Sequence, residues 1–263
     1  NIQSLKRVVV ELLQHVMIRH TKAQRIGGDI ALSLPPLDSS TVLVKMSKLE
    51  QKAYKAAVMQ EERPGELLER HLEVGTSTVG LHKSLSQRMA VCSGAASKLA
   101  TLVRDLNALR GEEPSLHAVV FTQHQDTMKS VVQRVRSEGY SVYKLSGDTE
   151  VAKRHEYIRR FQEKEDKAKV FVAMVKQGNC GVTLTAATRV YLMEPCINPA
   201  LEVQAAGRVH RLGQARGVLI QRLVMEGTFE QNVVKLHEDL RAGLKTMYHR
   251  KLSRDIIKTI VTK

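Results

Sequence analysis

The sequence contains no tryptophan, and four Phe and six Tyr bring its aromatic content to only 4%. A platform of aromatic side chains that stack on single-stranded bases is therefore not expected. The chain has no run of 18 or more apolar residues, so no helix is expected to span a membrane. An initiator methionine and a secretory signal are missing at Asn1, and we expect the sequence to be a piece of a longer protein.

Cysteine and metal-binding motifs are also sparse. Cys92, Cys180 and Cys196 are far apart in the sequence and form no CxxC pair. This spacing is unsuited to a disulfide framework or a zinc site, and it fits a reducing intracellular compartment. Ten histidines occur, but none belongs to an HExxH motif or a His/Cys quartet, so no metal site is expected.

Two motifs that ATP hydrolysis requires are missing. The sequence has no GxxxxGK(S/T) phosphate loop and no DExH-like acidic pair that could bind magnesium. Because a phosphate cradle and a metal site are indispensable to ATP hydrolysis, this chain alone is expected to be inactive as an ATPase.

Positive charge is abundant. Forty-one Lys and Arg stand against 27 Asp and Glu, which gives a net charge of +14 and a pI near 9.8. This balance indicates a polyanionic partner, with nucleic acid as the first candidate. Since aromatic residues are few, contacts to backbone phosphates are expected rather than contacts to bases. A basic but merely soluble protein is the alternative.

Short apolar segments alternate with helical patterns from about Ala96 onward. This alternation predicts an α/β fold, with a parallel sheet that carries helices on both faces. Residues 40–58 predict a strand followed by a helix, with Ser47 and Glu50 as a capping box. Strands are expected at 117–122, 140–145, 169–174, 189–194 and 217–225. Three regions are predicted: a helical linker region at 1–95, the α/β lobe at 96–236, and a C-terminal brace helix at 237–263.

The segment "QAAGRVHRLGQ" (204–214) places Gln204, Arg208 and Arg211 on one face if it is helical. The apolar residues Leu201, Ala205, Val209 and Leu212 would then face the core. Arginine suits multidentate contact with phosphate oxygens, and ligands of parallel sheets gather at the carboxyl ends of the strands. A phosphate is therefore the expected target, and a solvated helix face is the alternative. The nearby loop "VKQGNCGVTLT" (175–185) has glycines that allow close approach to an anion.

These segments resemble a known family. "QAAGRVHRLGQ" is similar to motif VI of the superfamily-two helicase-like ATPases, in the form found in Swi/Snf-type DNA translocases. In chain order, 119–131 resembles motif IV, 143–161 the strand–turn–helix that follows it, and 181–204 motif V. The forms "GNCG" and "EPCINPA" are most similar to the Rad-five and SNF-histone-linker-PHD-RING branch.

The resemblance implies that the chain is a C-terminal RecA-like lobe that completes an ATPase site held by an N-terminal lobe of the same protein. That lobe would bind most of the ATP and Mg²⁺. The expected catalytic residues are the arginine fingers Arg208 and Arg211, with Gln204. Nucleotide contacts are expected from Gly178, Gly181 and Glu202. DNA contacts are expected from His124, Gly147, Asp148, Arg154, Lys176, Gln177, Asn179, Thr183 and Thr185.

The expected function is thus ATP-dependent translocation on double-stranded DNA, with nucleosomes as a further candidate partner, in a nuclear protein of chromatin or DNA repair. A non-catalytic RecA-like module that binds DNA or protein is the alternative, because motif V departs from the common pattern. The family commonly has Ser or Thr at Met174, Gly at Asn179 and Asn at Thr183, and an Asp-Pro pair where Glu194 and Pro195 stand.

Overall fold

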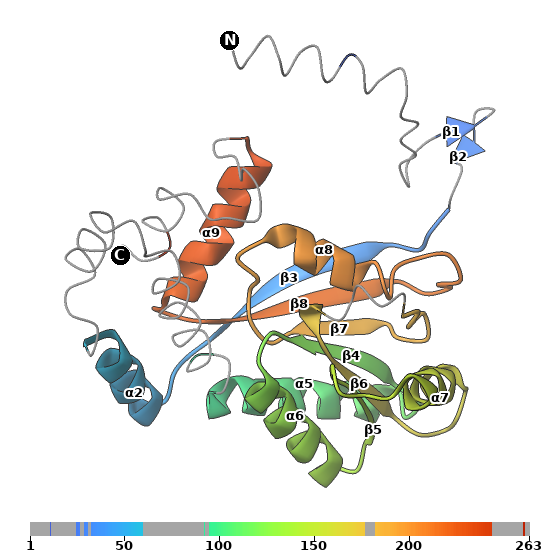
Figure 1. Ribbon diagram of the computed structural model, residues 1–263, viewed down its shortest axis with the longest axis horizontal. Coiled ribbons are helices and arrows are strands. Elements are labelled where there is room, and N and C mark those ends of the chain that lie inside the picture. Colours follow the sequence, from blue (N-terminus) through green and yellow to red (C-terminus); the bar gives the residue numbers. More distant parts are fainter. Residues whose placement is uncertain are drawn as a thin grey trace.

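The computed structural model describes residues 11, 25–26, 29–30, 33–59, 92, 95–176, 182–243 and 260. Their main feature is a six-stranded parallel sheet with helices on both faces, which confirms the predicted α/β fold (Figure 1). Within these ranges no helix is long and apolar enough to cross a membrane.

The strands are β3 (Leu37–Val44), β4 (His117–Thr122), β5 (Ser141–Leu145), β6 (Lys169–Met174), β7 (Arg189–Leu192) and β8 (Val218–Met225). Their order across the sheet is β3-β8-β7-β4-β6-β5. The central strand β4 is buried along its whole length, as the apolar run at its centre predicts. A separate antiparallel pair is formed by β1 (Arg25–Ile26) and β2 (Asp29–Ile30).

The helices are α2 (Lys48–Met59), α5 (Ala96–Glu112), α6 (Gln125–Ser137), α7 (Val151–Gln162), α8 (Pro199–Ala206) and α9 (Phe229–Arg241). Buried side chains of α5, α6 and α9 form one apolar cluster with one face of the sheet. Those of α7 and α8 form a second cluster with the other face. The strands divide their residues between the two clusters by alternation: Val120 belongs to the first, whereas Val119 and Phe121 belong to the second.

Local signals in the sequence place several helix ends correctly. The Ser47 amide donates to the Glu50 carboxylate at 2.7 Å, and the Glu50 amide donates to Ser47 Oγ at 3.3 Å, which confirms the predicted capping box. Asn198 caps α8 by accepting from the Ala200 amide at 3.0 Å. Gly139 follows α6 with a φ of 84°, a left-handed conformation that favours glycine.

The prediction of one continuous helix through Arg211 is wrong. Helix α8 ends at Ala206, and the chain continues through Arg211 as a series of turns. Ala205 and Val209 are fully buried as expected, but Leu212 is 75% exposed rather than docked on the core. The three polar side chains therefore do not share a helical stripe, and their positions must be taken from the turns.

The division into three regions stays a prediction, to which the structure adds one fact. Strand β3 comes from the region predicted as a linker, yet it pairs with β8 along its whole length as the edge strand of the sheet. Most of residues 1–32 and 60–94 of the predicted helical linker region lie outside the described residues, and so does most of the predicted brace helix.

Candidate functional site

The loops that follow the parallel strands meet at one edge of the sheet, here called the carboxyl edge. His124 comes just after β4, Gly147 and Asp148 come just after β5, and Lys176 comes just after β6. Gly147, Asp148 and Lys176 are exposed. Arg154 lies in the first turns of α7, which starts at the same edge. The structure thus brings together five of the predicted DNA-binding residues.

His124 occupies the N-cap position of α6 and is half-buried. Burial, together with the charges of Lys98 and Lys176, lowers the pKa of its imidazole below the ordinary 6.5, so the ring is neutral at pH 7. Its buried Nε2 has no hydrogen-bond partner among the described residues. Arg154 Nε is likewise buried and without a partner in this part of the chain. Buried polar atoms are normally paired, so these two atoms are candidates for contact with a ligand.

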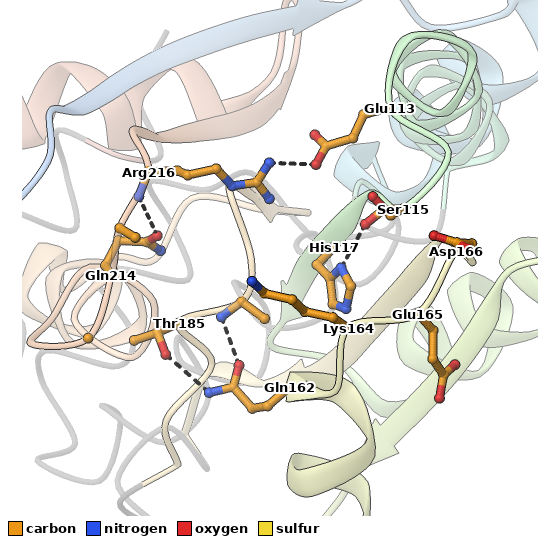
Figure 2. Close-up of a pocket in the computed structure, with 13 residues that line it drawn as sticks. Glu113, Ser115, His117, Gln162, Lys164, Glu165, Asp166, Thr185, Gln214 and Arg216 are labelled. Atoms are coloured by element: carbon orange, nitrogen blue, oxygen red, sulfur yellow. Dashed lines mark hydrogen bonds and ion pairs between the residues drawn. The ribbon is translucent and has the colours of Figure 1, made fainter.

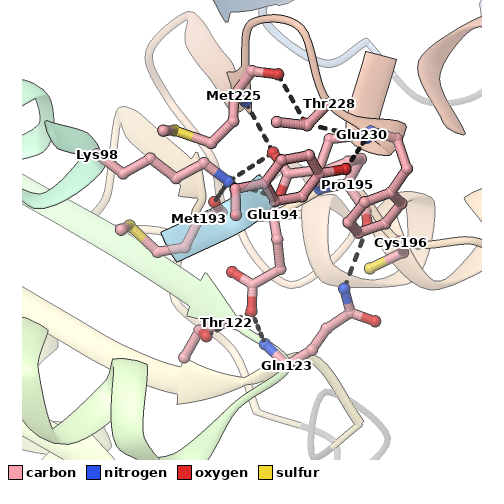
Figure 3. A network of polar contacts seen from close by, with 12 residues as sticks. Lys98, Thr122, Gln123, Met193, Glu194, Pro195, Cys196, Met225, Thr228 and Glu230 are labelled. Atoms are coloured by element: carbon pink, nitrogen blue, oxygen red, sulfur yellow. Dashed lines mark hydrogen bonds and ion pairs between the residues drawn. The ribbon is translucent and has the colours of Figure 1, made fainter. Parts of the chain in front are cut away.

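The carboxylate of Glu194, to which the sequence assigns no role, joins two loops of this edge (Figure 3). Glu194, just after β7, is fully buried, and its Oε1 accepts from Thr122 Oγ1 at 2.6 Å and from the Gln123 amide at 2.5 Å. Gln123 in turn donates through Nε2 to the Pro195 carbonyl at 3.2 Å. Burial raises the pKa of Glu194 to about 7, although Lys98 and the two hydrogen bonds oppose this change.

A buried ion pair lies beside this network (Figure 3). Lys98 of α5 is fully buried and donates to both carboxylate oxygens of Glu230, at 2.8 and 2.7 Å, and to the Met193 carbonyl at 2.8 Å. Glu230 also accepts from the Met225 amide at 2.8 Å. All three protons of the ammonium group are therefore used, and the pair links α5 to the start of α9 and to the ends of β7 and β8.

The motif VI arginines lie in the turns after α8 and differ in their contacts. Arg211 Nη1 donates to Thr183 Oγ1 at 3.1 Å. Arg208 is half-buried, and no described residue accepts a hydrogen bond from its buried Nε. Gln204, in the last turn of α8, is exposed. The structure therefore joins Arg211 to the motif V residue Thr183 and leaves the Arg208 Nε available.

These arginines do not lie at the carboxyl edge, contrary to the prediction. His210, between them, hydrogen-bonds through Nε2 to the Pro35 carbonyl at 2.8 Å, just before β3 begins. Gln214 fastens the same turn, because its Nε2 donates to the carbonyls of Ala187 and Val209. The turn lies toward the amino ends of the strands, since the crossover from β7 to β8 carries the chain back along the sheet. The predicted residues therefore form two separate groups.

Glu202 and Thr185 are directed into the protein. Glu202 is buried, with Oε1 accepting from the Cys196 amide at 2.8 Å and Oε2 paired with the guanidinium of Arg222. Both oxygens are thus bonded within the lobe, so its role is to hold α8 on the sheet rather than to contact nucleotide. Thr185 Oγ1 accepts from Gln162 Nε2 at 3.1 Å, away from the carboxyl edge. Gln177, Gly178, Asn179 and Gly181 lie outside the described residues.

A cavity of about 690 Å³ opens at the amino ends of β4 and β6 (Figure 2), whereas His124 follows the carboxyl end of β4. Its polar groups are largely paired with one another: Arg216 with Glu113 at 2.5 Å, and His117 Nδ1 with the Ser115 carbonyl at 2.8 Å. Among the described residues, Thr185 is the one predicted site residue that lines it, together with Gln214 of the arginine turn. The cavity therefore borders the arginine turn and is separate from the predicted residues at the carboxyl edge.

Residues 97–213 match the family model of the helicase conserved C-terminal domain. A putative SWI/SNF-related matrix-associated actin-dependent regulator of chromatin, subfamily A member 3-like 1, from Arabidopsis thaliana is 32% identical over 167 residues, or 63% of this chain and 19% of that protein. The helicase-like transcription factor of Mus musculus is 34% identical over 56% of this chain and 15% of its own length. The DNA repair protein RAD5 of Candida albicans is 32% identical over 54% and 14%. The chain thus spans less than a fifth of these relatives.

Solved structures share the fold. The C-terminal part of the Fun30 ATPase domain aligns with a TM-score of 0.66 at 15% identity, over 87% of this chain and 96% of that one. The Sulfolobus solfataricus SWI2/SNF2 ATPase C-terminal domain aligns with a TM-score of 0.61 at 20% identity, over 86% and 98%. The core of that ATPase in complex with dsDNA aligns with a TM-score of 0.65 at 21% identity, over 98% and 56%. The resemblance to a Swi/Snf-type C-terminal lobe of the RAD5-like branch and the RecA-like fold are confirmed.

Proposed function

We propose that this chain, whose residues 97–213 match the helicase C-terminal domain, is the second RecA-like motor lobe of an ATP-dependent translocase on double-stranded DNA. ATP and Mg²⁺ are bound mainly by an N-terminal lobe of the same protein, which supplies the phosphate loop that these residues lack. This lobe contributes Arg208 and Arg211 across the interlobe cleft and grips the DNA backbone with its carboxyl edge.

The observation that carries the proposal is the environment of the two arginines. The Arg208 Nε is buried without a partner in the described part of the chain, whereas Arg211 is tied to Thr183. A guanidinium with an unused donor can bind phosphate oxygens without first breaking a protein contact. Arg208 is therefore assigned as the arginine finger. Arg211 is held in place by its hydrogen bond to Thr183 of motif V. Gln204 is exposed in the last turn of α8, just before the arginine turn, and is assigned to sense the γ-phosphate.

DNA contact is assigned to the carboxyl edge. Lys176 and Arg154 supply positive charge there, and His124 supplies a neutral ring with an unused nitrogen. These groups suit phosphate oxygens and the sugar rather than base edges, so binding is expected to have little sequence preference. The net charge of +14 adds long-range attraction to the same partner. The relatives are named as a regulator of chromatin and a DNA repair protein, which favours a nuclear protein of DNA repair or chromatin with nucleosomes as a candidate partner.

The ATPase part is tested in the full-length protein. Arg208→Ala is expected to lower DNA-stimulated ATP hydrolysis by ~10³-fold or more, because arginine fingers stabilise charge in the transition state. Nucleotide binding should be spared. The matched control is Arg216→Ala, which removes the same charge from an arginine already paired with Glu113, and it should leave turnover near wild type. Near wild-type turnover of Arg208→Ala would show that the finger is misassigned.

The DNA part is tested with the chain itself and a fluorescein-labelled duplex of arbitrary sequence. Lys176→Ala should weaken binding and reduce the slope of log K against log salt by about 0.9, the change expected for one lost phosphate contact. Lys164→Ala removes a lysine at the amino edge and should change neither quantity. Equal effects of the two substitutions would mean that DNA does not bind at the carboxyl edge. Loss of DNA binding in Lys176→Ala, combined with no DNA-stimulated ATP hydrolysis by the wild-type full-length protein, would favour the non-catalytic binding module.

A further inference from the structure

Two loops of the carboxyl edge are joined by a relay of hydrogen bonds that starts at Glu194. The single hydroxyl proton of Thr122 points to the Glu194 carboxylate, at 2.6 Å. The same hydroxyl oxygen then accepts from the His124 amide, at 3.2 Å. The direction of the Thr122 hydroxyl therefore depends on Glu194, an acceptor that follows β7 and lies far away in sequence. The position of the His124 amide, just before α6, depends in turn on the Thr122 hydroxyl oxygen.

We propose that Glu194 is a positioning residue that acts through Thr122 and sets the place of His124 for contact with the DNA backbone. This inference rests on the proposed DNA binding at the carboxyl edge and names the residue that controls its geometry. Glu194 is itself fully buried, so it does not touch the DNA.

The energetics favour a positioning role over a purely stabilising one. Replacing a buried charged group by an apolar side chain of similar volume often leaves a protein equally stable or makes it more stable, because the charged group loses its hydration on burial. Here the carboxylate is retained at full burial, with Oε1 in use and no partner for Oε2 among the described residues. The gain that offsets the desolvation is the alignment of two donors: the Gln123 amide, and Thr122 Oγ1, whose alternative acceptor is the more distant His124 carbonyl at 3.5 Å.

The charged and titratable groups around Glu194 come from three further places. Lys98 of α5, Glu230 at the start of α9, and Cys196 in the same loop as Glu194 interact with it electrostatically. Burial outweighs the attraction of Lys98, and protonation of the carboxyl is therefore accessible near neutral pH. A neutral acceptor in the same position can still bind both donors, so the role of Glu194 depends on its oxygen and its shape.

The test measures duplex binding by the chain, with fluorescence anisotropy at pH 7.5. Glu194→Ala and Thr122→Val should each weaken binding by roughly threefold to tenfold, the range expected when one hydrogen bond to phosphate is lost. Glu194→Gln keeps an acceptor oxygen at the same place and should bind within about twofold of wild type, because hydrogen-bond geometry is preserved. Thr122→Val keeps the shape of the side chain and serves if Glu194→Ala does not fold, as judged by circular dichroism.

Combination with His124→Ala separates positioning from general damage. If Glu194 acts through His124, the double variant Glu194→Ala/His124→Ala should bind no more weakly than His124→Ala alone. Additive losses, or wild-type binding by both Glu194→Ala and Thr122→Val, would overturn the positioning role and leave DNA binding at this edge intact. No measurable binding by the wild-type chain, or no effect of Lys176→Ala, would instead refute the proposed DNA site and the inference with it.

Discussion

The buried pair of Lys98 and Glu230 allows a sharp test of how the lobe is held together. Both side chains are 0% exposed, and the ammonium makes three hydrogen bonds with no proton left over. Lys98→Met removes the cation and leaves the Glu230 carboxylate buried with only the Met225 amide as a donor. Glu230→Gln instead leaves a buried ammonium without its hydrogen-bonded carboxylate, with Glu194 as the nearby acidic group. Either substitution should cost about 3–5 kcal/mol of unfolding free energy, the usual effect of breaking a buried ion pair.

The double variant is the decisive case. In Lys98→Met/Glu230→Gln neither charge of the pair remains. The glutamine side chain can still accept from the Met225 amide, and the methionine side chain fills the place of the lysine stem. Its loss should be smaller than that of either single variant, since neutral replacements of buried pairs are often close to neutral in stability. The coupling energy between the two sites should therefore be at least about 3 kcal/mol.

Urea unfolding at pH 7, followed by far-UV circular dichroism, measures all four proteins. The control is Lys129→Met, which breaks an exposed pair with Asp126 of 3.0 Å and should cost less than about 1 kcal/mol. A loss below about 1 kcal/mol for Lys98→Met, or a double variant whose loss equals the sum of the two single losses, would refute the reasoning that an unpaired buried charge causes the effect.

Three further outcomes follow from other contacts. Burial raises the pKa of Glu194 from the ordinary 4.5 to about 7, so the contribution of Glu194 to stability is full below pH 4.5 and is lost as the pH rises through 7. The difference corresponds to about 3 kcal/mol, and Glu194→Gln should flatten the change in urea midpoint between pH 5 and pH 8. Partial burial would raise the pKa of Glu50, but hydrogen bonds from Ser97 and Ser47 outweigh it and lower the pKa to about 2. The stabilisation by Glu50 is therefore present above pH 4.5 and lost on acidification, and Glu50→Ala should cost about 1 kcal/mol at pH 7 in thermal unfolding. Thr183→Val frees Arg211 and should lower DNA-stimulated ATP hydrolysis of the full-length protein by roughly tenfold while DNA affinity in the anisotropy assay stays unchanged.

The parts of the fold that the sequence predicts are those set by local patterns. Strands β4 and β6 have the bounds that the sequence predicts, because each centres on a run of four or five apolar residues, as strands buried on both faces require. The Ser47 capping box and Gly139 mark helix ends because their contacts lie within a few residues along the chain. These features could be predicted without knowledge of the tertiary structure.

The parts that the sequence does not reveal depend on long-range contacts. Glu194 follows β7 and Thr122 ends the adjacent strand β4, so the two side chains meet only once the sheet has formed. Nothing in the local sequence pattern distinguishes Glu194 from a surface carboxylate. Lys98 looks like an ordinary helical lysine until its partner, far along the chain, is known. The end of α8 was misplaced because the helical spacing continues past Ala206, whereas Gly207 and the buried Gln214 favour turns.

That misplaced helix end changes how the two proposed activities can be linked. Had Arg211 lain on a helix at the carboxyl edge, one surface would have met both ATP and DNA. Instead, the arginine turn lies toward the amino ends of the strands, so the two proposed sites lie at opposite edges of the sheet. Two residues of motif V contact this turn directly: Thr183 Oγ1 accepts from Arg211 Nη1, and the Leu184 amide donates to the Arg208 carbonyl at 2.9 Å. Motif V therefore contacts one arginine through a side chain and the other through the backbone. Thr183→Val removes the side-chain contact and leaves the backbone contact, so its effect on ATP hydrolysis measures how much the position of Arg211 matters.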